Sequence, residues 1–301
     1  MKERKIPTMK KFLAIIMAVA LTAALLAGCG GNSGSGTPST GTNTPSTGTS
    51  TPSTDTTKFS GVVNTDGSTS MADVMAVLQE SFKELQPDVT VNYSGTGSGA
   101  GIEAVLSGTC DIGLASRGLK AEEEEKGAVA HVVALDGVAV IVNTANSVND
   151  LTVEQIAQIF TGEITNWSQV GGADMEIAVL GREAGSGTRG AFEELVGVED
   201  ACVYTNEYGS TGDVIGSVAS NPNAIGYASL SAVDETVSPV KVGGVECSEA
   251  TVKDGSYEIQ RPFIMVTNSA NELSAQAQAF LDYAQSAEVA EYIAIAGAVA
   301  P

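Results

Sequence analysis

The length and composition of the chain limit the kinds of protein it can be. It has 301 residues, 43% of them hydrophobic, which is enough for about two domains with packed cores. Asp and Glu number 36 against 15 Lys and Arg, so the formal net charge is −21. This excess of negative charge argues against binding to nucleic acid and against electrostatic attachment to anionic lipid, because both need basic patches.

Few residues could carry metal or nucleophilic chemistry. The chain has one histidine, His131, and four cysteines that form no Cys-x-x-Cys pair. A zinc site would lack ligands, and a Ser-His-Asp hydrolase would depend on His131 alone. We therefore expect no metal, no cofactor and no enzymatic activity. Cys202 and Cys247 could pair and leave Cys110 free, but buried thiols are the default expectation.

Residues 1–28 are predicted to be a signal peptide. Residues 2–11 carry five basic side chains, and Phe12–Ala27 then runs for 16 residues without a charge. A membrane span needs about 20 apolar residues, so this run suits the core of a signal peptide. It ends in Leu-Ala-Gly-Cys29, which resembles a bacterial lipobox. The resemblance implies cleavage before Cys29 and lipidation there with diacylglycerol and palmitate, leaving 10 basic and 35 acidic residues in the mature chain.

Residues 29–57 are predicted to be a lipid-anchored cysteine followed by a disordered tether. From Gly31 to Thr57 there are ten Thr, six Ser, five Gly and three Pro, with no apolar side chain. Such a stretch cannot bury enough surface to offset the entropy lost on ordering. An anchor and a tether together indicate that the folded part works near a membrane face but not inside the membrane.

The folded part is predicted to begin at Lys58, with strands and helices in alternation. Short apolar runs predict strands at 59–64, 89–93, 112–115, 132–135, 138–143, 177–181, 225–227 and 263–267. Helical spacing of apolar residues predicts helices at 71–85, 101–107, 153–160, 189–196, 213–220, 275–284 and 287–296. This alternation predicts an α/β fold, and 244 residues suit two α/β domains better than one.

Three turns rich in glycine and hydroxyl side chains each stand between a predicted strand and a predicted helix. They lie at residues 66–70, 94–101 and 182–189. The first N–H groups of a helix lack partners within the helix, and its dipole is positive there, so an anion can bind. Glycine lets the backbone approach a ligand, and hydroxyl groups add donors. A single turn would be explained as an N-cap, but three turns, one with two arginines, indicate an anion site.

At these residues the chain resembles the PstS family, the phosphate-binding lipoproteins of phosphate ABC transporters. The matching stretches follow the family order, at residues 67–70, 92–101, 111–117, 136–143, 164–167, 182–189 and 225–228. Each is weak alone, but their order is specific, and they cover about residues 58–301. The resemblance implies an α/β, two-lobed periplasmic-binding-protein type 2 fold with phosphate in the cleft between the lobes.

The resemblance also implies which residues contact phosphate. By position in the matching motifs, the expected donors are Thr69, Ser70, Ser98, Ser186, Gly187 and Thr188. Arg182 matches the arginine that pairs with phosphate. The mechanism implied is capture of a dehydrated oxyanion by amides, hydroxyls and a guanidinium, without any bond being made or broken.

One position departs from the family pattern. Many members have an aspartate after the strand equivalent to 112–115, which accepts a hydrogen bond from protonated phosphate. Here Ser116 stands at that position, followed by Arg117, and both are kept as candidate ligand residues. A carboxylate accepts from a P–OH group but repels a bare sulfate oxygen. Asp136 is the candidate substitute; if it only caps a turn, the acceptor must be sought at Glu183 or elsewhere.

Two predicted strands, 138–143 and 263–267, are expected to carry the chain between the lobes. Lobe 1 would then be residues 58–143 and 262–301, and lobe 2 would be residues 144–261. The last helices return to lobe 1 because they need its sheet to cover. Since the expected donors come from both lobes, ligand binding should close the cleft.

The expected function is capture of inorganic phosphate and its delivery to an ABC transporter permease and ATPase. The protein is expected to be a monomer, anchored at Cys29 on the extracytoplasmic face of a bacterial cell membrane, with no nucleic-acid partner. Two alternatives stay open. One is a binding protein for another tetrahedral oxyanion, such as sulfate, molybdate or tungstate, and the other is a phosphate sensor without a transport role.

Overall fold

A computed structural model of the protein describes residues 57–301. The predicted signal peptide, Cys29 and all but the last residue of the predicted tether lie outside the described residues. The strands are β1 (Gly61–Gly67), β2 (Val89–Ser94), β3 (Ile112–Ala115), β4 (Ala128–Asn143), β5 (Asp150–Leu151), β6 (Ala178–Arg182), β7 (Asn206–Tyr208), β8 (Ala224–Ser229), β9 (Val237–Pro239), β10 (Lys241–Val242) and β11 (Gln260–Asn268). The α-helices are α2 (Ala72–Leu85), α3 (Ser98–Leu106), α4 (Ala121–Glu125), α5 (Val153–Phe160), α6 (Gly187–Val196), α7 (Thr211–Ser220), α8 (Glu249–Lys253), α9 (Ala275–Ala284) and α10 (Ala290–Ile295). Short 3-10 segments are η2 (Thr69–Met71), η3 (Trp167–Val170), η4 (Leu230–Ala232) and η5 (Ala287–Val289).

Two parallel groups of strands are joined by two antiparallel strands into one sheet. Within the described residues, the order of this nine-stranded sheet is β2-β1-β3-β11-β4-β8-β6-β7, with β9 also beside β4. Strands β2, β1 and β3 are parallel, and so are β8, β6 and β7. The long strand β4 pairs with β11 over Ala128–Gly137 and with β8 over Val138–Val142. The fold therefore has a first half (β1–β3, with α2–α4, α9 and α10) and a second half (β6–β9, with α5–α8), and β5 and β10 of the second half pair in a separate two-stranded sheet.

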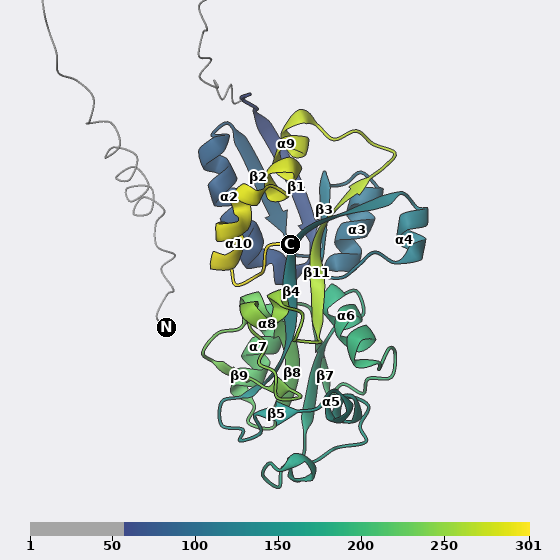
Figure 1. The fold of residues 1–301 in the computed structure, drawn as a ribbon. Helices are drawn as coiled ribbons and strands as arrows, with labels where there is room; N and C mark the ends of the chain where they lie inside the picture. Colours follow the sequence, from purple (N-terminus) through teal and green to yellow (C-terminus); the bar gives the residue numbers. More distant parts are fainter. Residues whose placement is uncertain (1–56) are drawn as a thin grey trace, which may run out of the picture. The chain divides into compact units, whose positions relative to one another are not determined.

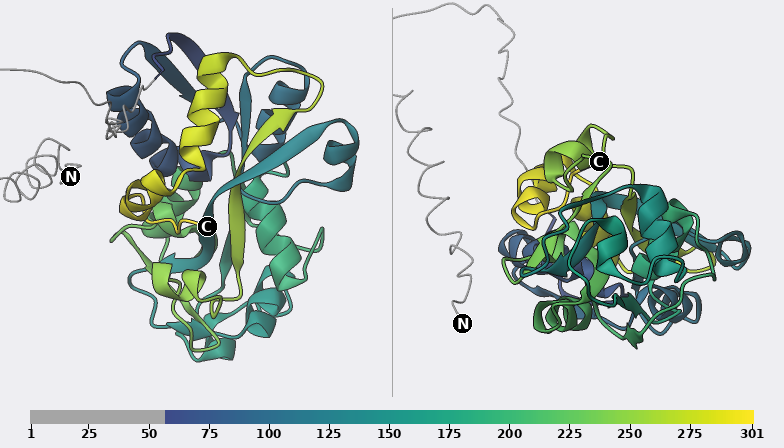
Figure 2. Two further views of the ribbon diagram at one scale, coloured as in Figure 1. Left: turned by 45° about the horizontal axis from the view of Figure 1, so that its top comes forward. Right: turned by 90° about the horizontal axis from the view of Figure 1, so that it is seen from below.

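Figure 1 shows β4 and β11 running side by side through the middle, with the first half above and the second half below. The turned view in Figure 2 shows the same pair of strands passing from one half into the other. The last residues of the chain also reach this crossing, because Leu135 and Val299 exchange backbone hydrogen bonds of 2.7 and 2.9 Å. The crossing is therefore made of two long strands that are clamped by the end of the chain.

Each half has an apolar core, as the hydrophobic patterns predicted. In the first half, Met75, Leu78 and Phe82 of α2 are buried against α9, α10 and one face of the sheet, while α3 covers the other face. In the second half, Trp167 is fully buried, and its indole N–H donates to the Asn223 carbonyl at 3.0 Å. The α/β class predicted from the alternating elements is confirmed by this arrangement.

The structure corrects one predicted break. Strands were predicted on either side of Asp136 and Gly137, but β4 continues through both residues without interruption. The reason is pairing, since Asp136 and Gly137 lie opposite Arg261 and Gln260 of β11. The exact lobe boundaries remain a prediction.

Three further observations concern expectations from the sequence. Cys110, Cys202 and Cys247 are all free thiols, so Cys202 and Cys247 do not pair. Within residues 57–301, no helix combines the length and the apolar character needed to cross a bilayer. Among these described residues, no three His, Cys, Asp or Glu side chains lie close enough together to hold a metal ion.

Candidate anion-binding site

Four helical segments begin with hydroxyl or glycine residues next to the crossing of the two halves. The segment η2 begins at Thr69 and leads into α2, while α3 begins at Ser98, α6 at Gly187 and α7 at Thr211. The helices α3, α6 and α7 begin two or three residues earlier than predicted, so the small residues of these turns lie in the first helical turn. The N–H groups of a first helical turn lack partners within the helix, and the helix dipole is positive there, so these positions suit an anion.

The halves meet through hydroxyl groups. The Ser70 hydroxyl of the first half lies 2.8 Å from the Thr188 hydroxyl and 3.0 Å from the Thr211 hydroxyl, both of the second half. The Thr69 hydroxyl lies 3.2 Å from the Thr211 hydroxyl and accepts a hydrogen bond from the Thr211 amide at 3.3 Å. Ser70, Thr188 and Thr211 are all buried. A hydroxyl can donate or accept, so each of these groups can replace its present hydroxyl partner by donating to an anion oxygen.

A second contact between the halves lies beside the first. Ser98 and Ser116 are buried, their hydroxyl oxygens lie 3.3 Å apart, and the Ser116 amide donates to the Ser98 hydroxyl at 3.2 Å. Gly187 of α6 packs directly on this pair, because a Cβ atom added there would lie 2.3 Å from the Ser98 hydroxyl oxygen. The Gly99 amide also donates to the Gly185 carbonyl at 3.0 Å. We call Thr69, Ser70, Ser98, Ser116, Thr188 and Thr211 the hydroxyl cluster.

Arg182, at the end of β6, brings a guanidinium to this cluster. Its side chain is 2% exposed. Nε donates to the Tyr208 carbonyl at 3.0 Å, Nη1 to the Thr211 hydroxyl at 3.1 Å, and Nη2 to the Gly209 carbonyl at 2.9 Å. Nη2 also pairs with Glu183 at 3.0 Å. These bonds fix the plane of the guanidinium, and one Nη1 proton remains for a ligand.

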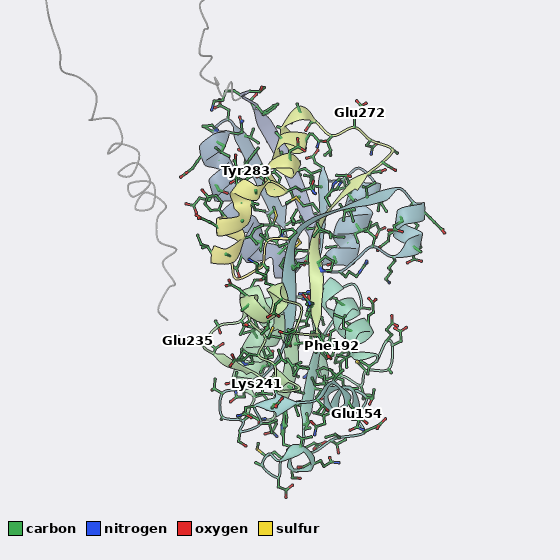
Figure 3. All side chains as sticks on the ribbon, in the orientation of Figure 1. Glu154, Phe192, Glu235, Lys241, Glu272 and Tyr283 are labelled. Carbon is green, nitrogen blue, oxygen red and sulfur yellow. The ribbon has the colours of Figure 1, made fainter. Side chains whose placement is uncertain are left out.

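Buried aromatic side chains support Arg182 from beneath. The Arg182 amide donates to the Tyr227 hydroxyl at 3.1 Å, which lies 3.1 Å from the Tyr204 hydroxyl. The Tyr204 hydroxyl donates to Glu193 at 2.9 Å. Phe192 of α6, labelled in Figure 3, stacks on Tyr227 with ring centres 4.2 Å apart. Burial raises the pKa of Tyr227, so this phenol stays neutral and keeps its hydrogen bonds at physiological pH.

Ser186 and Glu183 lie in the same turn and have structural partners. The Ser186 hydroxyl caps α6 by accepting from the Arg189 amide at 3.3 Å, so its own proton can still be donated elsewhere. The Glu183 side chain is 37% exposed and reaches toward the first half, where a Cβ atom added to Gly97 would lie 3.5 Å from Oε1. Glu183 is therefore a carboxylate at the rim of the cluster.

The structure gives Arg117 a different partner. Its guanidinium forms a two-pronged pair with Glu123, with Nη2 2.7 Å from Oε1 and Nη1 2.8 Å from Oε2. Burial would raise the pKa of Glu123, but the hydrogen bonds from Arg117 lower it below its usual value. Arg117 was a candidate ligand residue, and the structure does not bring its guanidinium into the hydroxyl cluster.

Asp136 lies beneath the cluster with its carboxylate fully occupied. Oδ1 accepts from the Ser229 hydroxyl at 2.8 Å and the Ser231 amide at 3.5 Å, and Oδ2 accepts from Arg261 Nε and Nη2 at 3.1 and 2.9 Å. The Ser231 hydroxyl in turn donates to the Ser70 carbonyl at 3.4 Å. Burial raises the pKa of Asp136, while the charge of Arg261 acts in the opposite direction. Asp136 neither caps a turn nor offers a free oxygen to a protonated anion.

Sequence reasoning missed two residues that the structure places here. Thr211 follows Ser210 at the start of α7, and this Ser-Thr-Gly turn is a fourth example of the signal that identified the other three. Arg261 was missed because a single arginine before an apolar strand carries no motif. Only its pairing with Asp136 across β4 and β11 shows its position.

This sheet, with strands crossing between two halves and a candidate anion site at the junction, defines a periplasmic-binding-protein type of molecule. A family model described as the PBP superfamily domain matches residues 37–288, so the chain belongs to that superfamily. It is 34% identical over 243 residues to the phosphate-binding protein PstS of Bacillus subtilis, covering 78% of this chain and 79% of the relative. The chain belongs to the PstS family.

Solved structures agree with this assignment. The chain is 42% identical to a putative phosphate ABC transporter substrate-binding protein with bound phosphate from Clostridium perfringens, with a TM-score of 0.77 over 80% of this chain and 100% of that one. It is 35% identical to an ABC-type phosphate transport receptor from Vibrio cholerae, with a TM-score of 0.66 over 79% of this chain and 100% of that one. The predicted two-lobed periplasmic-binding-protein type 2 fold is confirmed.

Proposed function

We propose that this chain captures inorganic phosphate outside the cytoplasmic membrane and delivers it to an ABC transporter permease and its ATPase. The observation that carries the proposal is the hydroxyl cluster, where Ser70 of the first half and Thr188 and Thr211 of the second half converge beside the buried Arg182. The names of the relatives, which are phosphate-binding proteins and transport receptors, support the same ligand.

The proposed mechanism is binding without chemistry. Phosphate replaces the contacts between hydroxyl groups. It accepts hydrogen bonds from these hydroxyls, from the Arg182 guanidinium and from the amides at the start of α3 and α6. Charge-assisted hydrogen bonds of this kind are short and directional. Because the net charge of the chain is strongly negative, attraction comes from these local donors and not from the overall field.

The proposed ligand residues are therefore Thr69, Ser70, Ser98, Ser116, Arg182, Ser186, Gly187 and Thr188, with Thr211 added from the structure. The proposed lobes are residues 58–143 with 262–301, and residues 144–261. The course of β4 and β11 through both halves supports these boundaries. Lipidation at Cys29, the extracytoplasmic location and the monomeric state belong to the same proposal.

Titration calorimetry of the folded part with phosphate and sulfate tests the function. Phosphate is expected to bind with a stoichiometry of one, and sulfate is expected to compete with it only weakly. Tight sulfate binding without phosphate binding would overturn the ligand assignment. Small-angle scattering with and without phosphate tests closure, since the radius of gyration should fall when the two halves approach each other.

A further inference from the structure

Arg261 has one guanidinium nitrogen that the protein leaves unpaired. Its side chain is 1% exposed, and Nε and Nη2 both donate to Asp136 Oδ2. Nη1 is buried and has no hydrogen-bond partner among residues 57–301. A buried charged donor without an acceptor is costly, so such an atom in a native protein calls for a partner.

The sheet register places Arg261 at the edge that carries the hydroxyl cluster. Strand β11 runs antiparallel to β3, with Ile264 opposite Ala115. The carboxyl end of β3 and the amino end of β11 therefore share one edge of the sheet. Ser116 follows directly after β3, and Arg261 lies three residues before Ile264 on the neighbouring strand. Both residues accordingly lie at the edge that faces the second half.

The second half approaches Arg261 through α6. Arg261 lines a groove of about 580 Å³ together with Arg117 and with Arg189, Gly190 and Ala191 of that helix. The hydroxyl cluster does not line this groove, but Arg189 follows directly after its member Thr188. Burial lowers the pKa of the Arg261 guanidinium, Asp136 raises it, and the positive charge of Arg182 lowers it further. The link to the cluster is a chain of hydrogen bonds: Asp136, which holds Arg261, also accepts from the Ser231 amide, and the Ser231 hydroxyl donates to the Ser70 carbonyl.

We propose that Arg261 is a second arginine of the anion site, whose Nη1 donates to the bound oxyanion while Asp136 holds the guanidinium in place. The proposal rests on the function proposed above and adds a residue to that site. A guanidinium held at Nε and Nη2 presents Nη1 in one fixed direction, because the group is planar and rigid. Asp136 is then a positioning residue, and the anion supplies the acceptor that Nη1 lacks.

The opposing explanation is that Arg261 only neutralises the buried Asp136. Two variants separate these roles. Arg261→Lys keeps a positive charge opposite Asp136 but removes the planar fork. The double variant Asp136→Asn with Arg261→Gln removes both charges together, so it leaves no unpaired buried charge. Phe280→Leu in the core under α9 serves as a control that lowers stability away from the crossing.

Phosphate and sulfate affinities are measured for each folded variant by calorimetry, alongside its thermal unfolding midpoint. Both Arg261 variants are expected to bind phosphate at least tenfold more weakly than the wild type, while Phe280→Leu stays within twofold at a comparable loss of thermal stability. A folded double variant that binds phosphate within twofold of the wild type would overturn the proposal. A wild type that binds no phosphate would instead refute the proposed function, and the sulfate data would then decide the role of Arg261.

A measurement on the wild type keeps the proposal testable if the variants do not fold. Protein labelled with ¹⁵N-arginine is titrated with phosphate, and the guanidinium signals are followed by NMR. Signals from two arginines, Arg182 and Arg261, are expected to shift and to exchange more slowly with water. Spectra of Arg182→Lys assign one of the two. Changes confined to the Arg182 signals would show that Nη1 of Arg261 does not contact the anion.

Discussion

The hydroxyl oxygens of Ser70 and Thr188 lie 2.8 Å apart, although 118 residues separate them in the sequence. Ser70 belongs to the first half and Thr188 to the second, so a direct hydrogen bond between side chains joins the two halves. Each hydroxyl has donor and acceptor capacity, and an oxyanion between them would use only the donors. The same contacts that close the cleft are thus the ones that a ligand would take over.

Removal of the Arg182 guanidinium should weaken phosphate binding most. Arg182→Ala leaves a desolvated dianion short of its main countercharge, and the expected loss is about 2–5 kcal/mol of binding free energy. Calorimetry at pH 7 measures it, with circular dichroism as a check on folding. If the variant holds phosphate within threefold of the wild type, Arg182 is not a ligand.

Gly187 should tolerate no side chain in the closed form. Gly187→Ala places a Cβ atom 2.3 Å from the Ser98 hydroxyl oxygen and 2.8 Å from the Ser98 Cβ, so the halves cannot close fully. The expected loss of phosphate affinity is about 1–3 kcal/mol. Gly185→Ala is the matched control two residues away, because its added Cβ would meet no atom within 4 Å. Equal affinities for the two variants would contradict the close packing of α6 on Ser98.

The Thr211 hydroxyl should contribute to binding, although the turn that carries it was not among the three predicted from the sequence. Thr211→Val keeps the shape of the side chain but removes the acceptor of the Arg182 Nη1 bond and the partner of Ser70. We expect phosphate to bind about 1–2 kcal/mol more weakly. Thr161→Val is the control. It removes a hydroxyl at the C-cap of α5 that donates to the Ala157 carbonyl, and it should leave affinity unchanged. A Thr211→Val protein with unchanged affinity would place Thr211 outside the site.

Glu183 is the carboxylate that should distinguish phosphate from sulfate. It lies at the rim of the cluster, whereas both oxygens of Asp136 are occupied. Glu183→Gln should weaken phosphate relative to sulfate by about 1.5–3 kcal/mol, because the amide can donate to a bare sulfate oxygen. Competition of the two anions, measured for the wild type and the variant at pH 7, gives the ratio. An unchanged ratio would leave a hydroxyl as the acceptor of the P–OH group.

The pair of Arg117 and Glu123 should affect stability and not binding. The folded-state pKa of Glu123 is lowered, so its stabilising effect is fully present above the ordinary carboxyl pKa and is lost as the pH falls through the lowered value. Glu123→Gln should reduce the unfolding free energy by about 1 kcal/mol at pH 7. The difference from the wild type should vanish in acid, as thermal unfolding across pH will show. A fall in phosphate affinity at pH 7 would instead return Arg117 to the list of ligand residues.

The sequence predicts the fold and the main anion turns because these features are local. Alternating apolar runs and glycine-hydroxyl turns each occupy a few consecutive residues, and the turns that hold Ser70, Ser98 and Thr188 are recognised in this way. The structure brings these three residues of different turns into the same site.

The missed features depend on contacts across the sheet. The continuity of β4 depends on β11, which lies more than a hundred residues further along the chain. The occupation of Asp136 depends on Arg261, 125 residues away, and on Ser229, 93 residues away. No local sequence pattern predicts such a pairing. The sequence alone therefore could not show whether the Asp136 carboxylate is available to a ligand or already accepts hydrogen bonds on both oxygens.

The way the chain enters the fold determines how a pull from outside would act on it. The first described residues are fixed at the amino end of β1, where the Phe59 amide donates to Gln86 at 3.0 Å and Gly61 to Asp88 at 3.1 Å. The hydroxyl cluster begins at the other end of the same strand, with Thr69. Tension from any upstream segment would thus load one half alone, and it would neither oppose nor drive the closing of the cleft.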